Sequence, residues 1–335
     1  MSLLSNIKQW LGQGPAATPD SVLATAEEPS GESAGIKLAS KLWGRQAQQS
    51  AKKTLPSSWA ECPVVLNEYI NPQVSAGSVT RDWLSAVAAD YFPEPVDRAL
   101  SLGCGGGGLE RHGLDLGIAT TFDAFDVSEQ AIEVARTAAA KTRQSAKIQY
   151  ATANLNKLEF KPDIYGAVFA SQSVHHIEDL PHYMQQVSTT LIQGGLFVVN
   201  EFVGPNQFQW TDTQWQYAQQ MLQSIPEEYR HSIRGEGIKQ EIHRPTIEQM
   251  NAYDPTEAIR SEDIIPQMQK HFEIVERRDF GGTLLHLVLD DIAGNLSADE
   301  QGKKILRNLF QREKQLIESA EIESDFTLLI AKKTA

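Results

Sequence analysis

The stretch Arg98-Ala99-Leu100-Ser101-Leu102-Gly103-Cys104-Gly105-Gly106-Gly107-Gly108 decides how the rest of the chain is interpreted. Its first five residues have the pattern of a short buried strand, and the run of glycines that follows ends that strand sharply. Consecutive glycines let the backbone approach a ligand that any Cβ atom would push away. The simpler alternative is a glycine-rich turn that holds no ligand.

A second strand indicates what the ligand contains. Thr121 to Phe125 has the pattern of a strand and leads to Asp126, about 20 residues after the glycines, as a nucleotide-binding βαβ unit requires. A carboxylate at that tip can accept hydrogen bonds from two hydroxyl groups of a ribose. We therefore expect a nucleoside-containing cofactor. A nicotinamide dinucleotide stays open at this point, because Gly103, Gly105 and Gly108 also satisfy the pattern G-x-G-x-x-G.

Composition limits the classes of function. The chain has 335 residues, 41% of them hydrophobic, and a net charge of −13. This length suits one large core with an accessory region, or two modest domains. The negative surface would repel phosphate backbones and anionic lipids, so we expect neither nucleic acid nor membrane as a partner. Two cysteines cannot form a disulfide framework, and the N-terminus does not have the pattern of a signal peptide, so the expected location is cytoplasmic.

Strands and helices alternate through the middle of the chain. Further strands are expected at 148–153, 165–171, 196–200, 272–276 and 325–332. Ser128 is a natural N-cap for the helix after Asp126. A second helix is marked by a stripe of apolar residues, and we expect Gly194-Gly195 to end it. The stripe consists of Leu180, Tyr183, Met184, Val187 and Leu191. The alternation predicts an α/β fold with a doubly wound, mostly parallel seven-stranded sheet.

The flanking segments divide the chain further. Residues 1–35 are rich in Gly, Ala, Pro, Ser and Thr, which predicts a flexible N-terminal segment. Residues 36–95 are expected to form a helical accessory region. The core then comprises 96–202 and 272–335, and 203–271 is a helical cap inserted after the fifth strand. Within this insert we expect one helix over 210–225 and another that begins at Pro255, after an Asp cap.

This order of motifs resembles the class I S-adenosylmethionine-dependent methyltransferases over roughly residues 96–202 and 272–333. Leu102 to Gly107 matches the family's glycine motif, and Asp126 matches its ribose-binding acid. Ala153-Asn154-Leu155 matches the adenine-side segment, and Ser171 to His176 the stretch after strand four. The resemblance implies that S-adenosyl-L-methionine is bound by Gly103, Cys104, Gly105, Asp126, Val127, Asn154, Leu155 and Ser171.

The chain departs from the family at two positions. Many members carry an acid two residues before the first motif glycine, where this chain has Ser101. The usual water-mediated hold on the methionine amine must then be replaced or absent. Strand four commonly contains a Phe-Asp or Tyr-Asp pair, where this chain has Tyr165-Gly166. These departures leave open a cofactor-binding interaction module without catalysis.

Three residues at the expected carboxyl edge of the sheet are catalytic candidates. His175 and His176 follow strand four, and either could take a proton from a substrate hydroxyl or amine. Adjacent side chains diverge, so we expect at most one to reach the reaction centre, and both could simply line the cofactor pocket. Glu201, at the tip of strand five, could orient the substrate, act as a base, or serve only as a capping carboxylate.

The substrate-binding candidates come from the insert. Trp210 and Trp215 could wall an apolar pocket, or pack as a seam against the N-terminal helices. Arg260 could hold a carboxylate or phosphate of the substrate, or pair with Glu257 on the helix expected from Pro255. We expect no metal site. No cluster of oxygen ligands follows strands four and five, and the histidines lack the i, i+4 spacing of a helical site.

These observations predict an S-adenosylmethionine-dependent methyltransferase with a small-molecule methyl acceptor. Methylation of oxygen is favoured over that of nitrogen or carbon. The alternatives are a nicotinamide-dependent oxidoreductase and the non-catalytic module. The protein could act as a homodimer.

Overall fold

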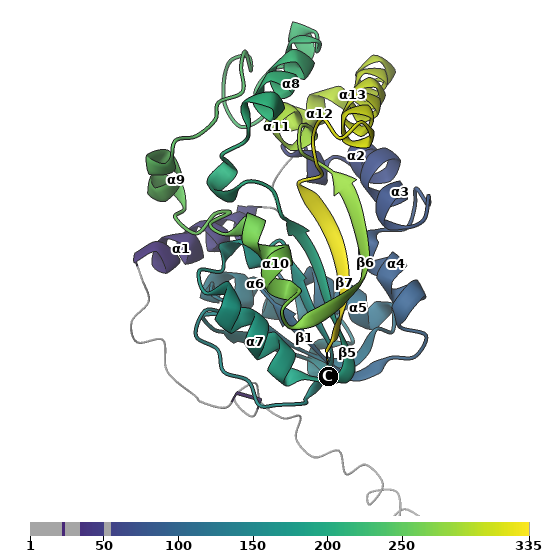
Figure 1. Cartoon of the computed structure of the whole chain (residues 1–335), viewed down its shortest axis with the longest axis vertical. Helices are drawn as coiled ribbons and strands as arrows, with labels where there is room; N and C mark the ends of the chain where they lie inside the picture. Colours follow the sequence, from purple (N-terminus) through teal and green to yellow (C-terminus); the bar gives the residue numbers. More distant parts are fainter. Residues whose placement is uncertain (1–21, 24–33, 50–54, 335) are drawn as a thin grey trace, which may run out of the picture.

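The computed structural model describes residues 22–23, 34–49 and 55–334 (Figure 1). The predicted flexible segment 1–35 lies outside the described residues, except for Val22, Leu23 and the first two residues of a helix. Val22 is buried, and Leu23 forms an isolated antiparallel bridge with Phe160. Within the described part of the chain, no helix combines the length and the apolar character that crossing a membrane requires.

A seven-stranded sheet forms the centre of the molecule (Figure 1). Its spatial order is β3-β2-β1-β4-β5-β7-β6. β7 is antiparallel to β5 and β6, and all other neighbours are parallel. The predicted fold class is confirmed. The strands are β1 (Val96–Leu102), β2 (Ala119–Asp126), β3 (Ile148–Thr152), β4 (Tyr165–Ser171), β5 (Leu191–Phe202), β6 (Phe272–Gly281) and β7 (Phe326–Lys333).

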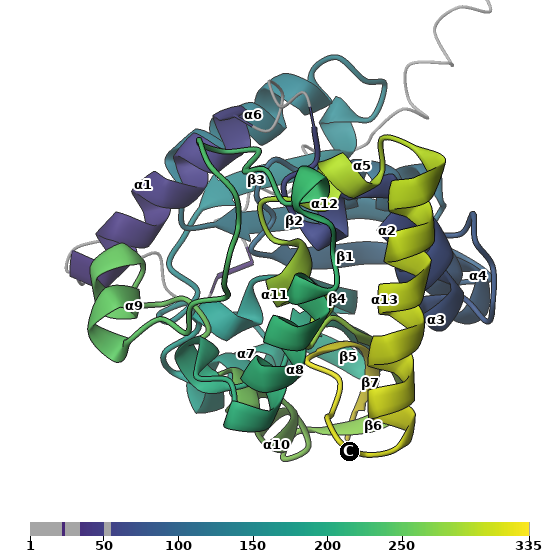
Figure 2. The same cartoon turned by 90° about the horizontal axis from the view of Figure 1, so that it is seen from above.

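Helices cover both faces of the sheet because successive strand residues point to opposite sides. Ala99 belongs to the cluster that packs on α4 (Trp83–Tyr91) and α6 (Glu129–Ala139). Its neighbour Leu100 belongs to the cluster that packs on α7 (Leu180–Thr190) and α10 (Ile264–Met268). α5 (Gly108–Asp115) contacts β2 and α4, and α1 (Ala34–Gln49) lies along α6 (Figure 2). A short 3-10 turn, η5 (Ser145–Lys147), leads into β3.

α7 carries four of the five residues of the predicted apolar stripe, and the fifth, Leu191, begins β5; all five are buried. Asp179 caps the helix by accepting a hydrogen bond from the His182 N–H. The expectation that Gly194-Gly195 ends this helix is wrong, because Leu191 already has extended backbone angles and the two glycines lie within β5.

The N-terminal accessory region packs against helices from the far end of the chain. It contains η3 (Trp59–Glu61), α2 (Pro63–Val65), η4 (Leu66–Ile70), α3 (Asn71–Val74) and α4. Its partners include α11 (Leu285–Leu289) and α13 (Glu300–Glu318), which α12 (Ala293–Leu296) precedes. The buried Glu313 carboxylate of α13 accepts the Tyr69 hydroxyl at 2.5 Å and the N–H groups of Gly282 and Leu284 at 3.0 and 2.6 Å. This carboxylate therefore fastens the accessory region to the core.

The insert contains η7 (Asn206–Phe208), α8 (Asp212–Gln223), η8 (Glu227–Tyr229), α9 (Ile247–Tyr253) and η9 (Ser261–Asp263), and then α10. α8 falls within the predicted helix and starts with a capping box between Thr211 and Gln214. The helix expected from Pro255 is wrong, because residues 255–260 form turns. The Asp254 carboxylate binds the N–H and hydroxyl of Thr256, and Ala258 has a φ of +51°, which no helix accommodates.

Candidate functional site

A cavity of about 700 Å³ lies at the carboxyl ends of β1, β2 and β4. The strand order reverses between β1 and β4, and open α/β sheets bind their ligands beside such a switch point. The N-terminal accessory region contributes Leu66, Trp83 and Leu84 to the wall, and the insert contributes Thr256. All eight residues predicted to bind the cofactor line this cavity: Gly103, Cys104, Gly105, Asp126, Val127, Asn154, Leu155 and Ser171.

Two glycines of the turn after β1 are required by different constraints. Gly103 has a φ of +76°, and a Cβ atom there would lie 2.3 Å from the Cβ atom of Ser173. Gly105 has a φ of +51°, but a Cβ atom there would meet no other residue within 4 Å. The space beside Gly105 therefore belongs to the cavity, and its backbone is left open to a ligand.

Asp126 lines the cavity and also braces the glycine turn. Its Oδ2 atom accepts the Gly105 N–H at 2.8 Å, and its Oδ1 atom accepts the Ser128 N–H at 2.8 Å. Burial raises the pKa of this carboxyl group, and the backbone hydrogen bonds offset part of the effect. Each carboxylate oxygen can accept more than one hydrogen bond, so the ribose-binding role predicted from sequence remains open to it.

Asn154 offers an unused donor at the end of β3. Its Oδ1 atom accepts the Asn156 N–H at 3.0 Å. Its Nδ2 atom is buried, and no residue that the structure describes accepts a hydrogen bond from it. A buried amide without a partner is costly, so a ligand with an acceptor atom on this side of the cavity would fit it well.

Glu110, which no motif in the sequence marked as a site residue, lies in the first turn of α5 and is fully buried. Burial raises the pKa of this carboxyl group to about 7, and the hydroxyl of Ser101 partly counters the shift. Ser101 itself lines the cavity. A carboxyl group from the following helix therefore lies beside Ser101, although Glu110 does not itself line the cavity. The available signal was an acid only a few residues after the glycine run.

His175 and His176 lie on η6 (Val174–His176), a single turn after β4 that Glu201 holds in place. The Oε1 atom of Glu201 accepts the N–H groups of Ser173 and Val174 at 2.7 and 2.6 Å, and also that of His175 at 3.3 Å. Its Oε2 atom lies 2.6 Å from His175 Nδ1. Glu201 is fully buried and does not line the cavity, so it is a positioning residue here.

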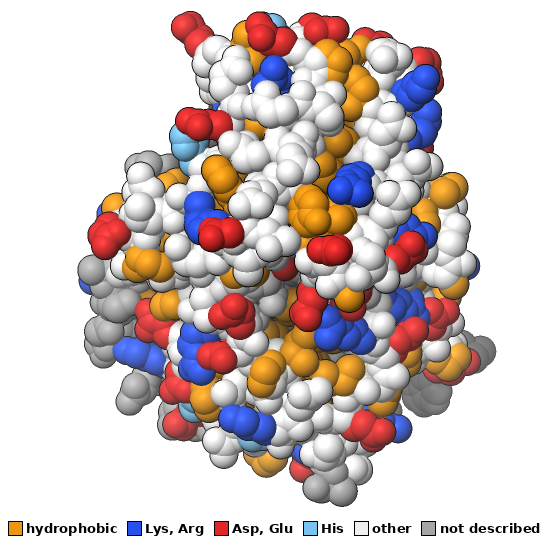
Figure 3. All heavy atoms as spheres, turned by 45° about the horizontal axis from the view of Figure 1, so that its top comes forward, with side chains coloured by type: hydrophobic (Ala, Val, Ile, Leu, Met, Phe, Trp, Pro, Cys, Tyr) orange, Lys and Arg blue, Asp and Glu red, His pale blue; other side chains and the backbone are white. Residues whose placement is uncertain are grey.

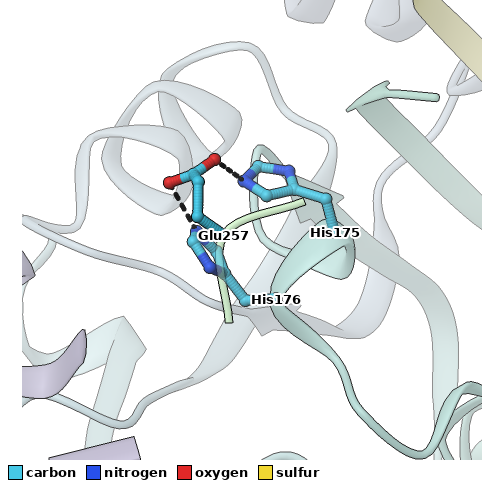
Figure 4. Close-up of side chains that lie close together, drawn as sticks. All are labelled: His175, His176 and Glu257. Atoms are coloured by element: carbon cyan, nitrogen blue, oxygen red, sulfur yellow. Dashed lines mark ion pairs between the residues drawn. The ribbon is translucent and has the colours of Figure 1, made fainter. Parts of the chain in front are cut away.

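Glu257 places its carboxylate between the two imidazole rings (Figure 4). Glu257 Oε1 lies 3.5 Å from His175 Nε2, and Oε2 lies 3.9 Å from His176 Nε2. The ring centroids are 4.2 Å apart, so the expectation that these adjacent side chains diverge is wrong. Of the three catalytic candidates, only His176 lines the cavity, together with its neighbour Thr256.

The surroundings of the two histidines shift their pKa values in opposite directions. Burial alone would lower the pKa of His175, but the negative charges of Glu201 and Glu257 outweigh it and raise the pKa to about 9. Burial and the adjacent His175 lower the pKa of His176 well below its usual value. Burial raises the pKa of Glu257. His176 is therefore the neutral ring of the pair.

The three substrate-binding candidates lie away from this cavity. Trp210 is buried and stacks on Phe208 with ring centroids 5.4 Å apart. Trp215 donates its indole N–H to the Ile242 carbonyl at 2.8 Å. Arg260 forms an ion pair with Asp263 at 2.9 Å, in place of the pair with Glu257 that the sequence suggested. Trp83 of α4 is the tryptophan that lines the cavity, and only tertiary packing distinguishes it from the others.

Residues 100–199 match a family of proteins described as "Methyltransferase domain". Residues 100–199 are a methyltransferase domain. The sequence is also 23% identical over 145 residues to a sterol 24-C-methyltransferase of Clavispora lusitaniae (strain ATCC 42720). That alignment covers 42% of this chain and 38% of the relative, so it spans well under half of the relative's length.

Solved structures share the fold of the methyltransferase domain and its surroundings. A geranyl diphosphate C-methyltransferase from Streptomyces coelicolor A3(2), solved with Mg²⁺, geranyl-S-thiolodiphosphate and S-adenosyl-L-homocysteine, superposes with a TM-score of 0.53 at 12% identity. The match covers 91% of this chain and all of that one (100%). The cyclase SpnF matches with a TM-score of 0.50 at 13% identity, over 89% and 97% of the two chains. A shared fold therefore accommodates more than one reaction.

Proposed function

We propose that this protein binds S-adenosyl-L-methionine and transfers its methyl group to an oxygen atom of a small molecule. The observation that carries the proposal is the convergence of the eight cofactor-binding candidates on one cavity, in which the backbone beside Gly105 is open. The methyltransferase domain over residues 100–199 supports the same cofactor.

The residues present fit the cofactor group by group. Asp126 offers carboxylate oxygens to the ribose hydroxyls, and the free amide of Asn154 offers a donor on the adenine side. The turn at Gly103 to Gly105 leaves room for the backbone to approach the ligand. Glu110 lies behind Ser101, and its carboxyl group, with a pKa of about 7, is partly ionised at neutral pH and so would carry part of a negative charge toward the positively charged methionine end.

The acceptor would occupy the part of the cavity between the accessory region and η6. Leu66, Trp83 and Leu84 make this wall largely apolar, and His176 and Thr256 supply polar groups. The bound cofactor supplies an activated methyl group, so the protein must mainly align the acceptor and exclude water. A hydroxyl acceptor also loses a proton as the methyl group arrives, and the neutral His176 ring lies beside this space.

Calorimetry with S-adenosyl-L-homocysteine tests the cofactor. We expect micromolar affinity, weakened by Asp126→Ala by about 1.5–3 kcal/mol, as for loss of a charged hydrogen-bonding partner. Asp97→Ala is the matched control, because Asp97 is exposed near the opposite end of β1. Binding of NADH without binding of S-adenosyl-L-homocysteine would overturn the proposal.

A panel of hydroxyl-, amine- and alkene-bearing small molecules, incubated with labelled S-adenosyl-L-methionine, tests the reaction itself. Label transfer to oxygen supports the proposal. Transfer to carbon would agree with the names of the sterol and geranyl diphosphate relatives and would correct the acceptor atom. Tight cofactor binding without turnover over the whole panel would favour a non-catalytic module.

A further inference from the structure

His175, His176 and Glu257 bring three potential ligand atoms to one point beside the cavity (Figure 4). One atom from each side chain lies within 4.8 Å of the others. The two histidines come from η6 and the glutamate from the insert, so the point exists only where these segments meet. The Glu257 side chain is 14% exposed and the His176 side chain is 17% exposed, so this point is accessible to solvent.

The environment of His175 directs its Nε2 atom toward this point. His175 Nδ1 lies 2.6 Å from Glu201 Oε2. Because an ionised carboxylate can only accept, the hydrogen of the neutral ring lies on Nδ1. The other nitrogen, Nε2, faces Glu257; in the protonated ring that the raised pKa of His175 favours it carries a hydrogen, which a bound cation would displace. Carboxylates that bind the remote nitrogen of a histidine are typical of metal sites, where they fix the tautomer and the ring orientation.

A second chain of hydrogen bonds fixes the tautomer of His176. The Thr256 hydroxyl donates its single hydrogen to Asp254 Oδ1 at 2.7 Å. It must therefore accept from His176 Nδ1, which lies 3.1 Å away. The hydrogen of this ring is thus also on Nδ1, and Nε2 is directed toward Glu257 as an acceptor. Both tautomers are set by residues outside the point at which the rings converge.

The distances at this point suit a shared cation better than direct hydrogen bonds. The nitrogen–oxygen separations are 3.5 and 3.9 Å. Charged hydrogen bonds are roughly 2.7–2.9 Å long. Two ligands held about 2.0–2.1 Å from one ion in tetrahedral geometry are roughly 3.4 Å apart. We propose that His175, His176 and Glu257 bind one divalent transition-metal cation such as Zn²⁺ or Fe²⁺.

The three ligands determine which class of metal would bind and how many coordination positions remain open. Imidazole nitrogens favour first-row transition ions over Mg²⁺ or Ca²⁺, and two histidines with one carboxylate leave coordination positions for other ligands. His176 is the ligand of the three that lines the cavity, beside Thr256, so the site would border the space assigned to the acceptor. If the proposed function holds, the cation would orient an acceptor oxygen there, and His176 would serve as its ligand and not as the proton acceptor. Binding of the metal does not depend on that function.

No metal site was expected from the sequence, because neither the spacing of the histidines nor the residues after strands four and five indicated one. His175 and His176 are adjacent, and the third ligand follows far along the chain in the insert. Glu257 lies in a turn whose geometry depends on Asp254 and on a backbone hydrogen bond from Ile259 N–H to the His175 carbonyl at 3.1 Å. No local pattern indicates that contact.

Titration of chelator-treated full-length protein with Co²⁺ tests the site, with visible absorption and calorimetry as readouts. We expect one equivalent to bind, with competition by Zn²⁺. Glu257→Gln and His176→Asn should each weaken binding at least about tenfold. Thr256→Val, which removes only the hydroxyl that fixes the tautomer, should weaken it by a smaller factor. His243→Ala is the matched control, because His243 forms an exposed pair with Glu241 at 3.5 Å and should leave binding unchanged.

Thermal denaturation with and without Co²⁺ separates binding from folding. The metal should raise the Tm of the wild type and of His243→Ala, and should do so much less for Glu257→Gln. Equal Co²⁺ uptake by the wild type and Glu257→Gln, or loss of uptake in His243→Ala, would overturn the proposal. Because S-adenosyl-L-homocysteine binding is measured separately, failure of the metal site and failure of the proposed function give different results.

Discussion

Glu110 shows at the scale of one residue how a buried carboxyl group links stability to pH. Its pKa is about 7 in the folded protein, against 4.5 for an ordinary glutamate. Between these values the folded state holds the proton more tightly than the unfolded state. The contribution to stability is therefore full below pH 4.5 and is lost as the pH rises through 7.

Glu110→Gln should make this position insensitive to pH. Because the amide stays neutral, we expect the variant to gain stability relative to the wild type as the pH rises. The gain should be roughly 1 kcal/mol at pH 5 and about 3 kcal/mol at pH 8. Urea unfolding at both pH values measures the difference. Glu129→Gln, at an exposed position in the first turn of α6, is the control for the loss of one carboxylate. A difference for Glu110→Gln that does not grow with pH would contradict this account.

Among single residues, those that follow a motif could be predicted and those that depend on burial could not. Gly105 and Asp126 were found because a strand, a turn and an acid follow in a fixed order, and both line the cavity. Glu110 was not singled out and Glu257 was considered only as an ion-pair partner of Arg260, because nothing in their neighbours along the chain shows that the fold buries them. A buried acid is recognised only when the residues packed around it are known.

At the scale of elements, strands were easier to predict than the connections between them. Each of the seven predicted strands lies inside an observed strand or extends one residue beyond it, and the predicted bounds of β4 equal the observed ones. Parallel strands are buried on both faces, so their apolar runs are continuous in the sequence. The turn at 255–260 has no such signal. Its Pro255 looked like the start of a helix, but hydrogen bonds from Thr256 to Asp254 compete with helical ones.

The three residues of the insert that were predicted to bind the substrate do not line the cavity, and this leads to a prediction. Trp215→Ala and Arg260→Ala should leave the affinity for S-adenosyl-L-homocysteine within about threefold, under ~0.7 kcal/mol. The reason is that both side chains bond within their own surroundings, to Ile242 and Asp263, and neither lines the cavity. Calorimetry on both variants measures this. A larger loss in a variant that still unfolds cooperatively would place the insert in the cofactor site.

At the scale of the whole molecule, the cavity lies where three parts of the chain meet. The sheet supplies the glycine turn and Asp126, the accessory region supplies Trp83 and Leu84, and the insert supplies Thr256. The order of strands in the sequence predicted the contribution of the sheet. The other two depend on packing between distant segments, such as Glu313 holding Tyr69 and Gly282. Sequence patterns carry little information about such contacts, because each partner alone looks like an ordinary surface residue.

The distribution of charge over the molecule gives the last prediction. The net charge is −13, and on the face drawn in Figure 3 acidic and basic side chains alternate without a continuous basic stripe. Affinity for nucleic acid depends largely on neutralising phosphates with clustered lysine and arginine. We therefore expect no binding of duplex DNA or tRNA at physiological salt, measured by gel shift at low micromolar protein. Many of the basic side chains already pair with carboxylates, as Arg278 does with Asp90 and Arg307 with Glu68. A complex that persists at physiological salt would require a basic surface elsewhere on the chain, and would make RNA a candidate methyl acceptor in place of a small molecule.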